Sequence, residues 1–413
     1  MKLKKNVAEI LSFEIIKNMS NFTIEEFNHR ISKLQNHLAS KNIDAAVLTQ
    51  NSDIYYYSGS CEPLYLIIHS KKPAVMLARK AISRIREEVK HIELFEFYNS
   101  SDMQKIIDKL ELKNSGCIGF TLDTVSYSTV DRFKKIINFS AAADISFDVR
   151  MLRVCKSESE LNVQIEAGKI TAQLPEVIKK VFVPGMTELE LSAEIEKYFR
   201  LNGGSPVIRC RKEGIECIGV CSSGINSLSG TKFDGICSGS GISSATPYGA
   251  SRDIIQKNIP VIIDFGFSLY GYIVDITRMF CYGKVSDKII NAYNSMLKIE
   301  NELIKIIKPG TLWCDIYDSA FKMAVSAGYE KEFMGLDSEK VRFVGHGIGL
   351  ELDEPPFLAP KMNFLLEENM VIAIEPKVSL PDIGVIGIEN TYIIRNKHNQ
   401  LLTCCSNDFI YIN

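Results

Sequence analysis

The sequence predicts two domains of mixed helix and sheet: an α/β domain over residues 1–154 and an α+β domain over residues 155–413. Three observations predict this organisation. Helical and strand-like patterns alternate over the first part of the chain, and the character of the sequence changes around residues 153–158. After that point, a pattern of one helix followed by two apolar strands occurs twice, which indicates a weak internal duplication.

In the N-terminal domain, Thr23 and Glu26 have the spacing of a capping box, and apolar residues then recur at helical intervals as far as Leu38. Short apolar runs predict strands over residues 43–48, 67–68, 74–77 and 92–97. Apolar residues recur at helical spacing over residues 103–110 and predict a helix there. This alternation predicts an α/β domain.

The C-terminal domain begins with two predicted helices, from Ser159 to Phe182 and from Thr187 to Leu201, separated by the turn signal Pro184-Gly185. A second Pro-Gly pair, at residues 309–310, leads into another amphipathic helix that ends at Gly328. These two helix starts are the first half of the repeated pattern.

The second half of the repeated pattern is a pair of apolar strands that carry two acids. The first strand pair carries Asp264 and Asp275, and the second carries Glu375 and Glu389. A threonine follows the second acid of each pair by two residues, so the period-2 alternation of a strand places that acid and its threonine on one face. Two halves related by a pseudo-twofold axis would bring all four acids together.

Composition predicts a soluble globular protein, with 46% hydrophobic and 24% charged residues. A net charge of −2 without long charged runs gives no reason to expect nucleic acid or a membrane surface as a partner. Charged residues interrupt the first apolar stretch, so no signal peptide is expected. No stretch approaches the roughly 18 apolar residues of a membrane span. We therefore expect a cytoplasmic protein.

The eleven cysteines are scattered, with one loose cluster and no CxxC pair. That cluster comprises Cys210, Cys217, Cys221 and Cys237. Zinc and iron–sulfur sites need closely paired cysteines, so reduced core thiols are the better interpretation.

Each of the four acids lies in or beside an apolar run, and an ionised carboxylate is costly to bury without a partner. Two divalent cations would balance four carboxylates, since +4 and −4 sum to zero. The alternative is that each acid is exposed on an edge strand or pairs with a lysine or arginine. His346, within the glycine-rich residues 345–350, offers one nitrogen ligand, and this donor set suits manganese, cobalt, iron or zinc.

These residues resemble the metal ligands of the pita-bread metallopeptidases, which include Xaa-Pro aminopeptidases and prolidases. Asp264 stands in Ile-Asp-Phe-Gly, Asp275 in Ile-Val-Asp-Ile-Thr-Arg, and His346 in Gly-His-Gly-Ile-Gly. Glu375 stands in Ile-Glu-Pro and Glu389 in Ile-Glu-Asn. The resemblance implies a pita-bread fold for residues 155–413, a creatinase/prolidase-like domain for residues 1–154, and a homodimer.

The resemblance also implies an activity. Two divalent ions, manganese foremost with cobalt, zinc or iron as alternatives, would hold a bridging hydroxide that attacks the scissile carbonyl. Glu375 would carry the proton to the leaving nitrogen. The substrates would be small peptides with an Xaa-Pro bond, cleaved at the N-terminus of peptides or in dipeptides.

The sequence departs from the family pattern at four positions near these motifs. Tyr248 and Asp353 replace family histidines, Arg342 replaces the extra histidine of aminopeptidases P, and Gly387 replaces an arginine. We hypothesise that Tyr248 donates a hydrogen bond to an oxyanion and that Asp353 favours a cationic substrate group. The alternatives are packing for Tyr248 and local pairing for Asp353. For Arg278 a structural role is favoured over anion binding.

Three classes of function therefore stay open. The first is a dinuclear metal-dependent Xaa-Pro peptidase. The second is a metal-dependent hydrolase or lyase of the same fold that acts on a small non-peptide substrate, which the replaced histidines favour. The third is a binding or scaffold protein, against which the retention of five ligand positions argues, because binding alone does not require four buried acids.

Overall fold

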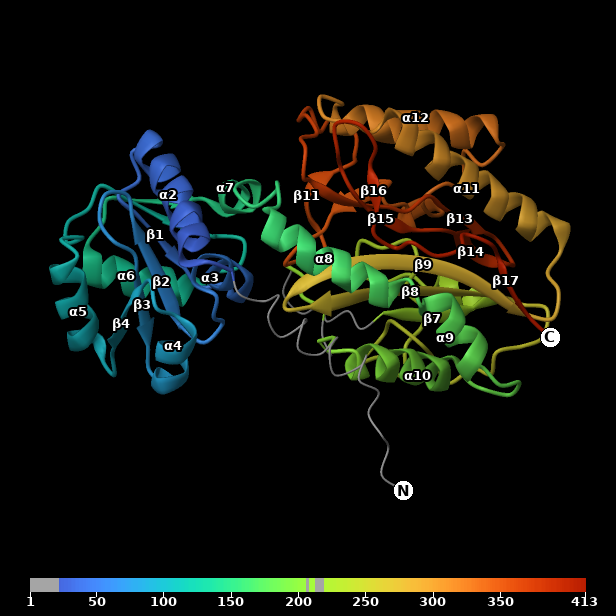
Figure 1. Cartoon of the computed structure of the whole chain (residues 1–413), viewed down its shortest axis with the longest axis horizontal. Coiled ribbons are helices and arrows are strands. Elements are labelled where there is room, and N and C mark those ends of the chain that lie inside the picture. Colours follow the sequence, from blue (N-terminus) through green and yellow to red (C-terminus); the bar gives the residue numbers. More distant parts are fainter. Residues whose placement is uncertain (1–21, 206–207, 212–218) are drawn as a thin grey trace, which may run out of the picture. The chain divides into compact units, whose positions relative to one another are not determined.

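The computed structural model describes residues 22–205, 208–211 and 219–413, and the chain divides into two compact units (Figure 1). The first unit ends at Arg153 and the second begins at Val154, while Arg211 groups with the first. The sequence placed the domain boundary after residue 154. None of the helices in the described residues is long and apolar enough to cross a membrane.

The first unit contains a six-stranded sheet in the order β4-β3-β2-β1-β5-β6. Its strands are β1 Ala45–Leu48, β2 Tyr65–His69, β3 Val75–Ala78, β4 Glu93–Glu96, β5 Cys117–Phe120 and β6 Ala141–Asp144. Its helices are α2 Ile24–Ser40, α3 Asn51–Ser58, α4 Ile82–Glu88, α5 Ser100–Lys109, α6 Tyr127–Ile137 and α7 Ser146–Met151. The four strands predicted from apolar runs and the helix predicted over 103–110 are confirmed.

The first helix shows why these residues fold locally as predicted. The Thr23 hydroxyl accepts the Glu26 N–H at 3.2 Å, which satisfies one of the unpaired amides at the start of α2. The carboxylate of Glu26 accepts a hydrogen bond from Arg30 on the next turn. The apolar stripe of α2, including Leu34 and Leu38, is buried.

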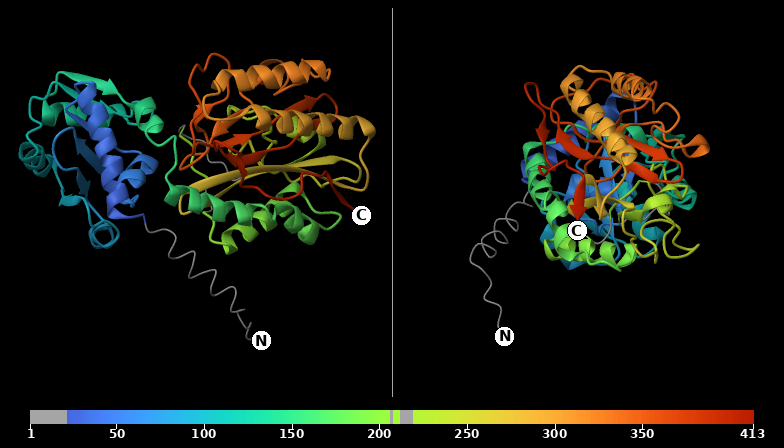
Figure 2. Two further views of the ribbon diagram at one scale, coloured as in Figure 1. Left: turned by 45° about the horizontal axis from the view of Figure 1, so that its top comes forward. Right: turned by 90° about the vertical axis from the view of Figure 1, so that its right-hand side faces the viewer.

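In the described part of the second unit there are five α-helices, which lie on two sides of its strands (Figures 1 and 2). Helices α8 Glu158–Thr171, α9 Leu174–Val181 and α10 Glu188–Leu201 lie on one side, and α11 Asp287–Ile306 and α12 Trp313–Ser326 on the other. Two short 3-10 helices, η1 Gly224–Leu228 and η2 Asp337–Glu339, complete the helical segments of the described residues.

The strands described for this unit form three sheets. One has the order β17-β9-β8-β7, one is β11-β10-β12-β15-β16, and one is the hairpin β13-β14. Their bounds are β7 Val220–Ser223, β8 Pro260–Leu269, β9 Tyr272–Tyr282, β10 Gly345–Gly347, β11 Glu354–Phe357, β12 Val371–Ile374, β13 Lys377–Leu380, β14 Gly384–Gly387, β15 Asn390–Ile393, β16 Gln400–Leu401 and β17 Ile410–Ile412.

The helix predicted from Ser159 to Phe182 is wrong as a single element. The chain forms α8 and α9 instead, which are separated by two residues before Leu174. Pro175 explains the break, because its ring has no N–H to donate and would clash with the carbonyl of Thr171 in a continuous helix. Near the start of α9 the missing N–H costs nothing. The second predicted helix is confirmed as α10, with a complete capping box between Thr187 and Glu190.

The two acid-bearing strand pairs meet as the duplication predicts. Thr277 on β9 and Glu389 beside β15 form an isolated antiparallel bridge that joins the two sheets. Thr391 on β15 reaches back to β9, where its hydroxyl donates to the carbonyl of Asp275 at 2.8 Å and accepts the Asp275 N–H at 3.0 Å. The predicted α/β domain followed by an α+β domain with two similar halves is confirmed.

Candidate active site

The register of the long hairpin β8–β9 sets the positions of the two aspartates. Asp264 pairs with Thr277, and Gly266 pairs with Asp275. Asp264 and Asp275 are therefore diagonal neighbours on one face of the hairpin, within reach of a shared partner. Asp275 is only 5% exposed, so its carboxylate needs a cation or hydrogen-bond donors.

The second sheet supplies the remaining predicted ligands from three adjacent strands. His346 on β10 pairs with Ala373 on β12, and Glu375 follows the end of β12. Glu389 immediately precedes β15, whose first residue pairs with the last residue of β12, so both glutamates lie at the same end of this ladder. The Thr277 hydroxyl donates to Glu389 Oε2 at 2.8 Å, which ties the two sheets together at the site.

The His346 ring is oriented with one nitrogen toward the acids. Its Nδ1 lies 3.1 Å from the carbonyl of Gly347, which assigns the proton to Nδ1, and 3.5 Å from Asp353 Oδ1. Its Nε2 then faces Glu375 Oε1 at 3.6 Å and Glu389 Oε1 at 4.0 Å. Burial alone would lower the pKa of this imidazole, but the three surrounding carboxylates raise it above its usual value.

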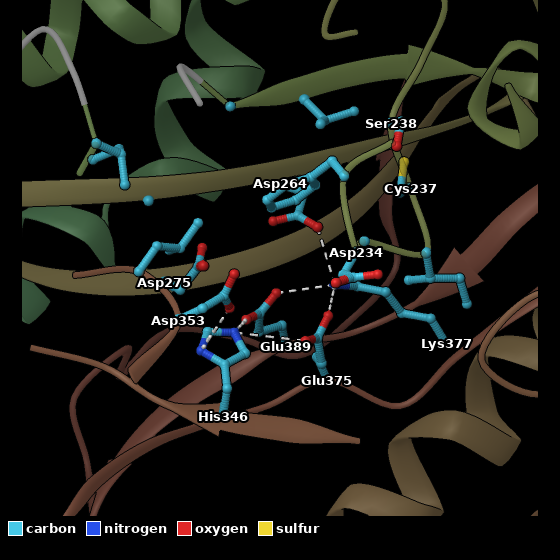
Figure 3. Close-up of a pocket in the computed structure, with 18 of the residues that line it drawn as sticks. Asp234, Cys237, Ser238, Asp264, Asp275, His346, Asp353, Glu375, Lys377 and Glu389 are labelled. Atoms are coloured by element: carbon cyan, nitrogen blue, oxygen red, sulfur yellow. Dashed lines mark hydrogen bonds and ion pairs between the residues drawn. The ribbon is translucent and has the colours of Figure 1, made fainter. Parts of the chain in front are cut away.

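Lys377, which is not among the residues predicted from the sequence, lies at the centre of the acidic cluster (Figure 3). Its Nζ is 3.0 Å from Asp264 Oδ2, 2.7 Å from Glu375 Oε2 and 3.0 Å from Glu389 Oε2. Burial disfavours the charged ammonium, yet these three carboxylates raise the pKa of Lys377 well above its usual value. Three of the four acids therefore pair with a lysine, which the sequence left open as the alternative to metal binding.

The aspartates respond to burial as well as to this lysine. Burial raises the pKa of Asp264 above its usual value although Lys377 opposes the change. Burial and then the charge of Glu389 raise the pKa of Asp275 well above its usual value. Asp275 lacks a direct contact to the ammonium among the hydrogen bonds of the described residues, so a further cation would stabilise its charged form most.

Asp275, His346 and Glu389 fit one divalent ion. One ligand atom from each lies within 4.8 Å of the others, and all three residues are buried. Glu389 Oε1, which faces His346, is a buried oxygen without a hydrogen-bond partner among the described residues. Such an atom is costly unless a cation binds it, and two carboxylates with one imidazole suit a catalytic transition metal.

The site opens into a pocket of about 770 Å³ of empty space. Its walls include the apolar side chains of Ile208, Phe233, Phe343 and Leu352 as well as the five predicted ligand residues. Tyr248 and Asp353, the two predicted substrate-contacting residues, both line it and are half-buried. Arg342 is exposed and is not among the lining residues of the described chain.

Arg278 is confirmed as a structural residue. Its guanidinium is fully buried and donates to the carbonyls of Thr277 and Glu389 at 2.9 Å each and to Ser406 O at 3.1 Å. It also donates to Asn390 Oδ1 at 2.8 Å. These bonds fix the backbone that carries Glu389.

The expected core location of the cysteines holds for three of the ten in the described residues, Cys221, Cys237 and Cys281. Ten cysteines in the described residues are free, while Cys217 lies outside the described residues. Cys221 and Cys237 are buried, and burial raises the pKa of the Cys221 thiol well above its usual value. Among the described residues, no cysteine belongs to a group of side chains that could hold a metal ion.

Comparison with known families and proteins gives matches over both units. The sequence profile of metallopeptidase family M24 matches residues 164–396, and that of the creatinase/prolidase N-terminal domain matches residues 30–155. The uncharacterized peptidase YqhT of Bacillus subtilis is 26% identical over 93% of this chain and 100% of its own length. A Xaa-Pro dipeptidase of Pyrococcus furiosus is also 26% identical, over 91% of this chain and 97% of its own.

Solved structures resemble more than nine tenths of the chain in fold. The prolidase from Pyrococcus horikoshii superposes with a TM-score of 0.77 at 24% identity and covers 92% of this chain and 100% of its own. The Xaa-Pro dipeptidase from Bacillus anthracis has a TM-score of 0.79 at 24% identity, and the match covers 94% of this chain and 100% of the dipeptidase. At this identity the likeness establishes the fold.

Proposed function

Because the chain belongs to metallopeptidase family M24, we propose that it is a metal-dependent peptidase that cleaves Xaa-Pro bonds at the N-terminus of peptides or in dipeptides. The chain has the pita-bread fold and is a metallohydrolase. The observation that carries the proposal is the buried set of Asp275, His346 and Glu389, whose ligand atoms converge beside an open pocket. The Xaa-Pro specificity is supported by the names of the matching relatives.

A divalent ion held by these three residues would polarise the scissile carbonyl and lower the pKa of a bound water. Residues of the chain would then orient the imidazole of His346 and transfer a proton to the leaving nitrogen. Glu375 has its Oε2 bonded to Lys377, and its Oε1, which lies 3.6 Å from His346 Nε2, would carry the proton to the leaving nitrogen.

The other two proposed catalytic residues act from the pocket wall. Tyr248 lines the pocket, and its hydroxyl would donate a hydrogen bond to the developing oxyanion. Asp353, at 3.5 Å from His346 Nδ1, would hold the imidazole with Nε2 toward the ion, which adds a positioning role to the predicted preference for a cationic substrate group. The exposed share of its side chain, 35%, leaves room for both.

The chemistry of the pocket lining suits a short peptide. The apolar wall of Phe233, Phe343 and Leu352 would pack against a pyrrolidine ring. Manganese as the metal, a homodimer and a cytoplasmic location stay predictions from the sequence and the resemblance.

A metal-dependent hydrolase or lyase acting on a small non-peptide substrate is the second candidate. It is favoured by the pocket composition, because His346 is the one histidine among the lining residues of the described chain. The double variant Tyr248→His with Asp353→His separates the two candidates. A sharp rise in Xaa-Pro cleavage would mean that the native pocket is shaped for another substrate, whereas a fall would mean that it is suited to peptides as it stands.

The direct test is a panel of Xaa-Pro dipeptides and Xaa-Pro-Yaa tripeptides, assayed with protein stripped of metal and reloaded with manganese, cobalt or zinc. We expect cleavage before proline that needs metal and is lost in Asp275→Asn, because this change removes one charged ligand without altering side-chain size. Metal binding without cleavage of any peptide would contradict the proposal.

A further inference from the structure

We propose that the chain holds one divalent ion, between Asp275, His346 and Glu389, and that the ammonium of Lys377 takes the place of a second ion beside Asp264. The inference rests on the proposed metal dependence of the enzyme and concerns how many ions it uses. The sequence led us to expect two ions, and the residues around Asp264 do not fit the second.

The ammonium already uses the oxygens that an ion beside Asp264 would need. It is bonded to Asp264 Oδ2 and Glu389 Oε2 at 3.0 Å each, and to Glu375 Oε2 at 2.7 Å. An ion bound there would compete with these three bonds and would lie next to a like charge. Divalent cation and ammonium are therefore alternatives at this place.

The two oxygens of Glu389 differ in whether they already accept hydrogen bonds. Oε2 accepts hydrogen bonds from the Thr277 hydroxyl and from Lys377 Nζ. Oε1 has no hydrogen-bond partner among the described residues and lies 4.0 Å from His346 Nε2. One side of the carboxylate is thus open to a cation, and the other side is occupied.

The lysine is built into the hairpin that carries it. Lys377 on β13 pairs directly with Gly387 on β14, and its side chain is 1% exposed. A Cβ added at Gly387 would lie 2.4 Å from Cγ and 2.7 Å from Cα of Lys377. Any larger residue at 387 would therefore collide with the lysine, so the glycine provides the space in which the lysine stem crosses to the acids.

The charges of the cluster are compatible with a single ion. The four carboxylates contribute −4, the ammonium +1 and one divalent ion +2, which leaves −1 for a protonated group or a substrate amine to balance. Two ions with the ammonium would give +1. Both sums are small, so the occupied oxygens rather than the net charge decide between them. Asp264 is then a partner of the lysine and not a metal ligand.

The test counts bound metal in the full-length protein. Stripped protein is dialysed to equilibrium against saturating Mn²⁺, and manganese per chain is measured by elemental analysis together with the electron paramagnetic resonance spectrum. We expect one Mn²⁺ per chain with the spectrum of an isolated ion. In Lys377→Ala, which frees the three oxygens and opens space, we expect two ions and the spectrum of a coupled pair.

Lys156→Met is the matched control, because Lys156 is also buried and bonded to a carboxylate, Glu354, at 2.8 Å, yet does not line the pocket. It should keep one ion. Asp264→Asn gives a second test that does not depend on the folding of Lys377→Ala. It should also keep one ion, whereas a fall in the amount of bound metal would show that Asp264 is a ligand.

Each outcome separates the inference from the proposed function. Two ions in the native protein, or one ion in a folded Lys377→Ala variant, would overturn the inference and leave metal-dependent catalysis standing. Failure of the native protein to bind any ion would overturn both. One ion in the native protein and two in Lys377→Ala would support both.

Discussion

Replacing Arg278 by methionine should destabilise the second unit and loosen its metal site. The methionine side chain would retain the apolar stem but could not donate to the carbonyls of Thr277, Glu389 and Ser406. Leaving a buried acceptor without its donor costs about 1–3 kcal/mol. The Thr277 and Glu389 carbonyls keep weak backbone bonds to each other's N–H groups, so the lower value applies to each of them.

Ser406 is an exposed residue, so its carbonyl can bind water instead. Taking about 1 kcal/mol for each of the two buried carbonyls gives a loss of about 2 kcal/mol in the free energy of unfolding. Displacement of the Glu389 backbone should also weaken Mn²⁺ binding by roughly 10- to 100-fold, as is common when a group supporting a ligand is removed. Urea unfolding measures the first effect, and equilibrium dialysis with Mn²⁺ measures the second.

The control for this experiment is Arg342→Met, the same change at an exposed arginine of the same unit. It should leave both stability and metal affinity unchanged. If Arg278→Met unfolded at the same urea concentration as the native protein and bound Mn²⁺ equally well, Arg278 would have no part in holding Glu389, and our account of the site would be refuted.

Three further changes test other parts of the structure. Burial raises the pKa of Glu300 in the folded state, so the stability it contributes is fully present below about pH 4.3 and is lost as pH rises through the raised pKa. Unfolding by urea at a series of pH values should therefore show Glu300→Gln gaining stability relative to the native protein as pH rises, and parallel pH profiles would refute this. Gly387→Ala should cost about 1–3 kcal/mol in urea unfolding, because its Cβ would meet Lys377 Cγ at 2.4 Å; an unchanged midpoint would show that the hairpin accommodates it. Thr277→Val removes the hydroxyl that bonds Glu389 Oε2 and should weaken Mn²⁺ binding about tenfold in equilibrium dialysis, whereas native affinity would show that this hydroxyl does not orient the carboxylate.

Local patterns explain what the sequence could predict. Apolar periodicity and caps located α2, α10 and four strands of the first unit, since these signals depend on neighbouring residues. The position of Pro175 was a usable signal for the break between α8 and α9, but the apolar pattern continues through it and led us to one long helix. The acids were found because a carboxylate in an apolar run stands out without any tertiary information.

Lys377 illustrates what local patterns leave undetermined. A lysine two residues after Glu375 in an apolar run was a visible signal, yet the place of its ammonium depends on the register of β13 with β14 and on the space at Gly387. Both are properties of the folded hairpin. The contact of the ammonium with Asp264 further depends on how that hairpin meets β8, 113 residues away in the sequence.

The measurement that tests the central claim most directly is a titration of Mn²⁺ into the stripped protein while cleavage of an Xaa-Pro dipeptide is followed. Our account predicts that activity rises in proportion to added metal and reaches its maximum at one ion per chain. Absence of cleavage at every metal content would contradict the peptidase function, and activity that appears only with a second ion would contradict the role of Lys377.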